Sequence, residues 1–553
     1  MDDDAERIEP SRPDQVAPIW AAASAGLVSA GVALAAGELV VAIPGRNDPS
    51  LVSAVGAEFI DRFAAELKDV AVRLFGTNDK VALVCGIVLV SMVLGALLGT
   101  AARRRFWPAV CGFSAFGLLG AAAYRTDELG SDTLGTVAAA VAAAAGIATM
   151  WSLLRMAARL GAAPRSVEVD PAGDGVRVGD QVMVAPRSPL DPRHIARRAF
   201  LGTAAALGAG AAGMALVGRR IAGKGSSEAA RQQVVLPAAT VYDRDAVAGE
   251  VAPEEFDVGG LSPYITPNDD FYRIDTALSV PQVDLDSWRL RIKGMVDHPL
   301  EVSYADLLDM ESVSATVTIA CVSNEVGGGL VGNAVWQGVP LADVIERAGV
   351  GDGAEQVIGR SIDGWTAGFP VDVVTDGRTA MVAYAMNGEP LPVRHGFPAR
   401  LIVAGLYGYV SATKWLAEIE LSTWNAFDGY WVPRGWSKEG PIKTQSRIDV
   451  PRSGAELRAG TVPVAGVAWA PTRGISKVEV QVDDGPWRPC ELGPVSGDET
   501  WVQWIYRWRA EPGDHVVSVR ATDGDGETQT SDVARPDPDG ATGWHSRRWT
   551  VTG

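Results

Sequence analysis

Five long apolar stretches in the first 220 residues constrain this chain more than any other feature of its sequence. They are Ile19–Ile43, Val81–Ala102, Trp107–Tyr124, Thr133–Leu154 and Ala199–Gly218. The last four contain no Asp, Glu, Lys or Arg, and the first contains only Glu38. Because the hydrocarbon core of a bilayer takes about 20 apolar residues to cross, each stretch is a candidate membrane span. The sequence predicts an all-α transmembrane bundle over residues 19–220, after a cytoplasmic tail at 1–18.

The arginines between these stretches predict the orientation of the spans. Three consecutive arginines, 103–105, join the second and third stretches, and loops rich in Arg stay in the cytoplasm. The loop at 125–132 is net acidic. With an odd number of spans, the arginine-bearing segment 155–198 also lies inside. The chain is therefore expected to be a multi-pass membrane protein with residues 221–553 on the extracytoplasmic side.

Arg197 and Arg198 stand directly before Phe200 and the weakly apolar fifth stretch. This arrangement resembles a twin-arginine export signal, here internal, a route that moves domains already folded around a cofactor. The alternative is an ordinary positive flank of a membrane span. Glu38 in the first stretch is a second open case, either a polar site within the membrane or a helix-end residue that reaches toward water.

The remainder of the chain divides into three predicted segments. Residues 221–255 have little periodicity and are expected to be a linker. Residues 256–440 mix short strands with helical patches, a pattern typical of an α+β domain. Residues 441–553 contain short alternating strands separated by Gly, Asp and Pro, and they predict an all-β, immunoglobulin-like sandwich.

Cys321 is the residue in this region that most needs an explanation. It follows a β-branched run at 316–319 and opens a glycine-rich turn. A buried hydrophobic role is one interpretation, a nucleophile paired with His395 is another, and zinc is disfavoured because no second Cys or His lies nearby in sequence. The four cysteines cannot form a disulfide framework, and a net charge of −18 argues against a nucleic-acid partner.

The stretch from Pro267 to the C-terminus resembles the sulfite oxidase family of molybdopterin-dependent oxidoreductases, in its membrane-anchored bacterial type, and five collinear fragments carry the resemblance. They are PNDDFYR at 267–273, WRLRIKGMVDHPLEVSYADLL, CVSN with VGNAVWQGVPLADVI, AYAMNGEPLPVRHGFPARLIVAGLYGYVSATKWLAEIEL, and PIKTQSRIDVP. The resemblance implies a single-pterin molybdenum cofactor with Cys321 as the metal ligand. A soft thiolate suits such a metal, and the glycines at 327–329 would let the backbone approach it closely.

The resemblance also implies roles for other residues, position by position. Those matched to cofactor binding are Asn268, Phe271, Tyr272, Asp363, His395, Arg400, Ser411, Ala412, Thr413 and Lys414. Tyr430 and Arg273, together with Cys321, are the candidate catalytic residues. Sulfite oxidases proper carry more arginines near the metal than this chain does. A dianion needs a strongly cationic pocket, so sulfite is a doubtful substrate.

The expected function is two-electron oxygen-atom transfer on a small oxyanion, sulfoxide or similar oxide. None of the five histidines lies in an apolar stretch, so no haem is expected, and electrons would pass to an external cytochrome or the quinone pool. The resemblance allows a homodimer through the C-terminal domain. The alternative function is a cofactor-free, membrane-tethered binding or assembly module outside the cytoplasm.

Overall fold

The computed structural model describes residues 16–42, 49–60, 62, 79–126, 131–160, 192–222, 227–242 and 256–553. The chain forms two compact units, Met1–Gly225 and Ser226–Gly553. Three predicted segments lie partly outside the described residues: the tail 1–18, the arginine-bearing segment 155–198 and the linker 221–255.

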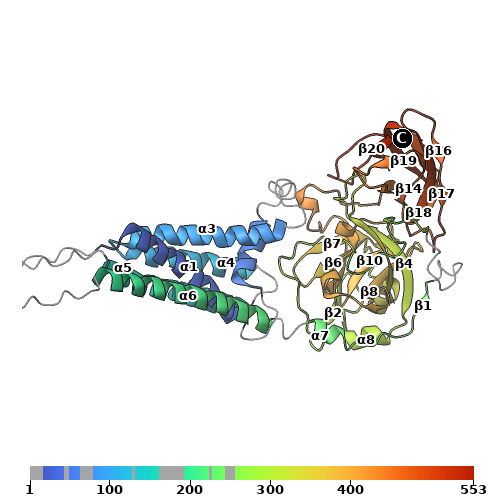
Figure 1. Cartoon of the computed structure of the whole chain (residues 1–553). Coiled ribbons are helices and arrows are strands. Elements are labelled where there is room, and N and C mark those ends of the chain that lie inside the picture. Colours follow the sequence, from blue (N-terminus) through green and yellow to red (C-terminus); the bar gives the residue numbers. More distant parts are fainter. Residues whose placement is uncertain are drawn as a thin grey trace, which may run out of the picture. The chain divides into compact units, whose positions relative to one another are not determined.

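The described part of the first unit is helical, with its long helices side by side (Figure 1). They are α1 (Ile19–Ala42), α3 (Asp79–Ala102), α4 (Trp107–Thr126), α5 (Asp132–Ala158) and α6 (Pro192–Ala222), with a shorter helix at Leu51–Ile60. By length and composition, α1, α3, α4 and α5 could cross a membrane. The fifth predicted span lies within α6, which is helical but is not among these four.

Helix α1 packs closely against α3 because both helices present small residues at the contact. A Cβ atom on Gly26 would lie 2.0 Å from the carbonyl oxygen of Gly95, and one on Gly99 would lie 2.1 Å from that of Ala22. Gly95 and Gly99 are four residues apart and therefore share one face of α3. Such small-residue faces let membrane helices approach backbone to backbone, which favours association in the absence of a hydrophobic driving force.

The two ends of the helical bundle differ in charge. One end is built around Ala21 of α1, the last turns of α3 and α5, and Phe200 of α6. Seven arginines of the first unit lie at this end: Arg103, Arg104, Arg105, Arg155, Arg159, Arg197 and Arg198. The Arg197 guanidinium lies 5.7 Å from the centroid of the Trp20 ring. The opposite end, around Val41, Tyr124 and Ala138, carries both acidic and basic side chains.

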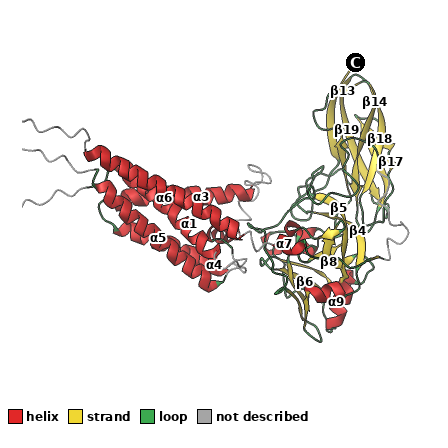
Figure 2. Ribbon diagram, turned by 60° about the horizontal axis from the view of Figure 1, so that its bottom comes forward, coloured by secondary structure: helices red, strands yellow, loops and turns green. Residues whose placement is uncertain are grey.

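The second unit is rich in strands, as the ribbon in Figure 2 shows. Its first part contains α7 (Ser227–Arg231), β1 (Thr240–Val241), β2 (Arg289–Gly294), β3 (Leu300–Ser303), α8 (Tyr304–Asp309), β4 (Val313–Ala320), β5 (Val331–Pro340), α9 (Leu341–Ala348), β6 (Gln356–Ser361), β7 (Thr366–Pro370), β8 (Ala380–Met386), β9 (Glu389–Pro390), β10 (Arg400–Val403), α10 (Gly408–Ser411) and β11 (Leu416–Ser422). Its second part contains β12 (Gln445–Val450), β13 (Leu457–Arg458), β14 (Gly460–Trp469), β15 (Ile475–Val482), β16 (Arg488–Pro489), β17 (Glu491–Leu492), β18 (Val502–Ala510), β19 (Gly513–Asp523) and β20 (His545–Thr552).

Two mixed sheets form the first part of this unit. One runs β1-β4-β5-β8-β10, with β9 paired to β8, and the other runs β3-β2-β11-β6-β7. Strand β4 consists largely of Val, Thr and Ile residues and is buried over most of its length, as a strand in the interior of a sheet requires. Local sequence signals are also present: Ser303 and Asp306 form a capping box at the start of α8.

The second part of this unit consists of two further sheets, β12-β14-β18-β17 and β13-β20-β19-β15-β16. They share one core, to which Val464 and Trp504 contribute from the first sheet and Val519 and Trp549 from the second. The observed two-sheet arrangement fits the predicted sandwich, while its assignment to the immunoglobulin type stays a prediction. The loop before β18 reaches into the first part, where Thr318 N–H donates to Glu499 O (3.0 Å).

Part of the predicted linker belongs to the fold of the second unit. Residues 227–242 contain α7 and β1, and β1 pairs in parallel with β4 through Thr240 and Val241. Between them, Val234 and Leu236 pack against the core. The segment lacks hydrophobic periodicity, and its residues contact several different parts of the domain.

Candidate active site

Cys321 lies at the end of β4, where the chain enters a tight loop before β5. Its backbone N–H donates to Leu330 O (2.9 Å), and the N–H of Asn324 donates to Cys321 O (3.0 Å). The Asn324 side-chain oxygen accepts from Leu330 N–H (2.8 Å), which closes the loop. Cys321 is only 8% exposed, so this loop holds a thiol in a largely water-excluded position.

Two of the glycines in this loop have a packing role that was not predicted. Gly327 has a φ of +76°, and a Cβ there would lie 2.2 Å from the ring of His545. A Cβ on Gly328 would lie 2.6 Å from the side-chain oxygen of Asn324. Arg447 donates to the carbonyl of Gly328 (2.8 Å). The C-terminal sheets therefore buttress the cysteine loop, and close packing alone already accounts for these two glycines.

The 267–273 loop places two aromatic rings beside the cysteine strand. The Phe271 ring meets Trp336 and His395 edge to face, each at 5.8 Å between centroids, and it stacks on Tyr272 at 5.3 Å. Gly332 makes room for it, because a Cβ there would lie 2.6 Å from the Phe271 ring. The predicted grouping of Phe271, Tyr272 and His395 is therefore present in the structure.

The Tyr272 hydroxyl shares an electrostatic environment with Cys321 and Arg400. Burial raises the pKa of Tyr272 well above its usual range, negative charge on Cys321 raises it further, and Arg400 opposes the rise. Thiol, phenol and guanidinium, which come from three separate segments, thus lie close enough to influence one another.

Arg400 is a buried cation with few partners. It is 4% exposed, its Nη1 donates to His395 O (3.1 Å), and its guanidinium lies 5.0 Å from the Trp336 ring centroid. Among the described residues, no hydrogen-bond partner reaches the Arg400 Nε or the buried hydroxyl of Thr413. Burial lowers the pKa of Arg400 to about 10. These groups remain able to bind an anion.

Lys414 adds a second cation, largely buried with 11% of its side chain exposed, and it is held by an acidic residue that the sequence analysis did not single out. Asp275 Oδ2 lies 2.7 Å from Lys414 Nζ and 2.7 Å from Arg273 Nε. Burial lowers the pKa of Lys414 to about 8, although the charge of Asp275 partly opposes this shift. Burial raises the pKa of Asp363, and the charge of Asp275 adds to that effect. The negative charge of Asp275 therefore partly offsets the positive charges of both Arg273 and Lys414.

His395 and Asn268 meet directly. The His395 Nε2 lies 3.0 Å from the carbonyl oxygen of Asn268, and His395 is 1% exposed. Burial, aided by the charge of Arg400, lowers the pKa of His395 to about 3. The ring is therefore neutral at physiological pH, and its Nε2–H donates to Asn268 O. It supports the 267–273 loop in addition to any contact with a ligand.

Three predicted residues make mainly local contacts. The Ser411 hydroxyl donates to the carbonyl oxygen of Tyr407 (3.1 Å), the residue before α10, and Ala412 follows it as a buried residue. Tyr430 contacts β7 through Thr366 and lies under the Arg434 guanidinium, 3.7 Å from its ring centroid. The catalytic role of Tyr430 stays a prediction.

Tyr407 is a further neighbour that the sequence analysis missed. Burial raises the pKa of Tyr407 to about 12, and among the charges that act on it Cys321 raises it further. The AGLYGYV segment quoted for the family contains Tyr407, but nothing in its spacing points toward the thiol.

Comparison with known proteins identifies the domain around this site. Residues 277–431 match the model of the oxidoreductase molybdopterin binding domain. The uncharacterized oxidoreductase YuiH of Bacillus subtilis is 38% identical over 157 residues, which cover 28% of this chain and 76% of that protein. Mouse mitochondrial sulfite oxidase is 29% identical over 316 residues, or 49% of this chain and 56% of the relative. The chain belongs to the sulfite oxidase family of molybdopterin oxidoreductases.

The matches cover the site unevenly. The molybdopterin-binding domain at 277–431 includes Cys321, Asp363, His395, Arg400 and Lys414, whereas the 267–273 loop precedes it. The chain spans about half the length of the mammalian sulfite oxidases it matches. Among solved structures, the sulfane dehydrogenase SoxCD from Paracoccus pantotrophus is 21% identical with a TM-score of 0.47, over 53% of this chain and 85% of that one.

Proposed function

We propose that this chain is a membrane-anchored oxidoreductase that binds one molybdopterin and uses Cys321 as the protein ligand of molybdenum. The observation that carries the proposal is the presence of a buried thiol, the buried cation Arg400 and the largely buried cation Lys414 in one molybdopterin-binding domain. A thiolate is a suitable ligand for a metal that the pterin also binds through sulfur. The four long apolar helices of the first unit support the membrane anchor.

The polar groups of the site fit a phosphate-bearing pterin. Arg400 and Thr413 each present a buried polar atom that lacks a hydrogen-bond partner among the described residues. Lys414 adds an ammonium group close by, and donors of this kind suit a phosphate. Asp363 is a carboxylate that can accept N–H groups of the pterin. Phe271 and Tyr272 offer aromatic surface to cover it.

When bound, the molybdenum cofactor supplies a two-electron redox centre suited to oxygen-atom transfer. The protein's part is to hold this group and limit the access of water. Burial of Cys321, Arg400 and His395 keeps that environment dry, which strengthens each electrostatic contact.

The proposed substrate is a small oxyanion, a sulfoxide or a similar oxide, and the charges favour its less anionic members. Arg273 and Lys414 are both within 2.7 Å of Asp275, so their charge is already partly offset. A dianion such as sulfite would find less compensation here for its lost hydration.

We also propose that the second unit lies outside the cytoplasm. Seven described arginines of the first unit lie at the end of the bundle where α6 begins, against Arg62 and Arg125 at the opposite end. The positive-inside rule assigns this end to the cytoplasm, so α6 would lead residues 227–553 to the other side. An external cytochrome or the quinone pool would accept or supply the electrons, no haem is expected in this chain, and a homodimer through the C-terminal sheets is compatible with the proposal.

Analysis of molybdenum and pterin in purified full-length protein tests the proposal. We expect about one pterin and one molybdenum per chain. In Cys321→Ser we expect the pterin to remain, the metal spectrum to change and turnover to fall by at least about a thousandfold, because a metal ligand is lost while the loop stays filled.

Protein that contains neither pterin nor molybdenum, when expressed in a host that makes the cofactor, would favour the alternative of a tethered binding module. Unchanged turnover in Cys321→Ser would refute the assignment of the ligand.

A further inference from the structure

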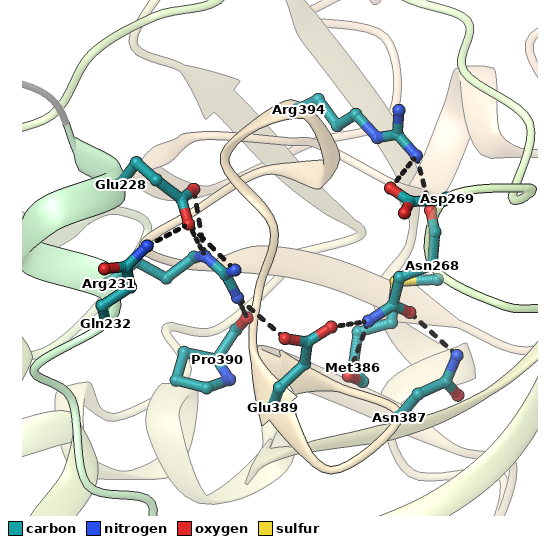
Figure 3. Close-up of polar contacts among 10 residues, drawn as sticks. All are labelled: Glu228, Arg231, Gln232, Asn268, Asp269, Met386, Asn387, Glu389, Pro390 and Arg394. Atoms are coloured by element: carbon teal, nitrogen blue, oxygen red, sulfur yellow. Dashed lines mark hydrogen bonds and ion pairs between the residues drawn. The ribbon is translucent and has the colours of Figure 1, made fainter.

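We propose that residues 227–242, here called the strap, position the 267–273 loop over the cofactor through one chain of polar contacts, from Arg231 through Glu389 to Asn268. Arg231 and Glu389 are thus positioning residues for cofactor retention. The effect on cofactor retention rests on the proposed function, whereas the contacts themselves are observed in the structure (Figure 3).

Arg231 is the first link. Its side chain is 16% exposed, and its Nη1 donates to Pro390 O (2.8 Å) and lies 3.2 Å from Glu389 Oε2. Its Nε and Nη2 donate to Glu228 at 3.0–3.2 Å, so the guanidinium is held on two sides. A guanidinium has donors in a fixed fork, which lets one side chain bridge two elements. Arg231 therefore ties α7 to the β8–β9 hairpin.

The hairpin is the second link. Asn387 and Gly388 form its turn with φ values of +52° and +80°, a conformation that Asn-Gly pairs favour. Glu389 then offers one carboxylate oxygen to Arg231 and the other to Asn268 Nδ2 (2.5 Å). Asn387 Nδ2 donates to Asn268 Oδ1 (2.8 Å). Both ends of the Asn268 amide are thus occupied by this hairpin, as Figure 3 shows.

The third link connects Asn268 to the site. The carbonyl oxygen of Asn268 accepts from Arg394 Nη2 (2.8 Å) and lies 3.0 Å from His395 Nε2. Phe271, three residues further on, packs against the ring of His395. Movement at Asn268 would therefore disturb the aromatic cover and His395 together.

The strap is itself anchored to the domain, so it can act as a support. Ser227 is 1% exposed, its hydroxyl donates to Val283 O (3.1 Å), and its N–H donates to the side chain of Gln282 (3.1 Å). Further along, Pro237 O accepts from the Gln337 amide (2.8 Å), before β1 joins β4. The support thus consists of domain contacts at both ends of the strap.

The test uses full-length, cofactor-loaded protein in detergent, with Arg231→Met and Glu389→Ala made singly and together. Pterin released into the filtrate is followed by the fluorescence of its oxidised form, and amide hydrogen exchange is measured at residues 266–273. We expect each single variant to release pterin about fivefold faster and to exchange faster in this loop. The double variant should also release pterin about fivefold faster and no more, because both substitutions break the same chain of contacts.

Arg520→Met is the matched control. Arg520 is also half-buried and contacts one carboxylate, Glu479, through two nitrogens, but it lies in β19 of the C-terminal sheets. It should change neither readout. The proposal would be overturned if the single variants released pterin within about twofold of the rate of the unmodified protein. It would also be overturned if Arg520→Met had the same effect as they do, or if the effects of the two substitutions multiplied in the double variant. If the unmodified protein lacks pterin, the proposed function fails, and hydrogen exchange alone still decides whether the strap holds the loop.

Discussion

At the residue scale, Asp275 is the side chain that most alters the expected chemistry of the site. It places a carboxylate between Arg273 and Lys414, and its 5% exposed side chain contacts Lys414, which is 139 residues away. The electrostatic character of the pocket therefore depends on a partner that the family fragments did not reveal.

We predict that Asp275→Asn makes the pocket more receptive to dianions. Removing one negative charge while keeping the shape frees Arg273 and Lys414, so the inhibition constant of sulfate should fall about tenfold. The measurement is inhibition by sulfate of turnover with any small oxide substrate. Asp269→Asn is the control, because the Asp269 side chain is 99% exposed and pairs with Arg394 at the surface. An inhibition constant that stays the same or rises would contradict the charge argument.

The buried histidines predict how stability depends on pH. The pKa of His395 is lowered to about 3 and that of His545 to about 4, in each case mainly by burial. Below about pH 6.5 these histidines bind protons in the unfolded chain but not in the folded chain, so stability falls on acidification. At pH 5 each of these two histidines should lower the free energy of unfolding by about 2 kcal/mol.

Thermal unfolding of the apo protein, followed by tryptophan fluorescence at pH 7.5 and pH 5, measures this effect. His395→Asn and His545→Asn should each reduce the loss of stability between the two pH values. The control is His298→Asn, which removes a histidine that is exposed instead of buried. Equal pH dependence in all four proteins would refute the assignment.

At the element scale, the strap and the C-terminal sheets are less separable from the catalytic domain than their sequences indicate. The strap adds β1 to the sheet that contains β4, and the C-terminal sheets contact the cysteine loop through Arg447 and His545. The second unit accordingly clusters as one body from Ser226 to Gly553.

We predict that a chain that begins at residue 256, the expected domain start, is less stable than a chain that begins at residue 227. The shorter chain loses Val234, Leu236 and the pairing of β1, which together contribute about 2–4 kcal/mol. Its unfolding temperature should be lower by about 5 °C, and its pterin content should fall. Comparing the two chains by calorimetry and pterin assay tests this, and equal stability would show that the strap is only a linker.

At the scale of the whole molecule, the distribution of arginines in the first unit predicts the side on which the enzyme works. Protease added to intact spheroplasts should remove the second unit, because residues 227–553 are expected on the extracytoplasmic side. An immunoblot against the C-terminus measures its loss. Full protection of the second unit would mean that the number of spans is even, with α6 the first helix to reconsider.

The double variant Arg197→Lys/Arg198→Lys separates the two interpretations of the arginine pair. Lys keeps the positive charge but not the planar fork of donors that a twin-arginine recogniser would read. If the export route is used, the second unit should stay protected in this variant while cofactor binding persists. Normal export would leave the pair as a positive flank only.

The sequence by itself determined the features that depend on short stretches of chain. Four of the five predicted spans match helices long and apolar enough to cross a membrane, because the length of an apolar run is a local property. The family followed from collinear fragments, and the grouping of Phe271, Tyr272 and His395 followed from the family.

The tertiary structure alone decided which charges and glycines act together. Asp275 with Lys414, Arg447 with the cysteine loop, and Arg231 with Glu389 are pairs that lie 119 to 158 residues apart. Hydrophobic periodicity reports which face of an element is buried, but it does not report which distant side chain meets it there. The proposed substrate preference and the proposed support of the 267–273 loop depend on such pairs, so neither could be inferred before the folded chain was seen.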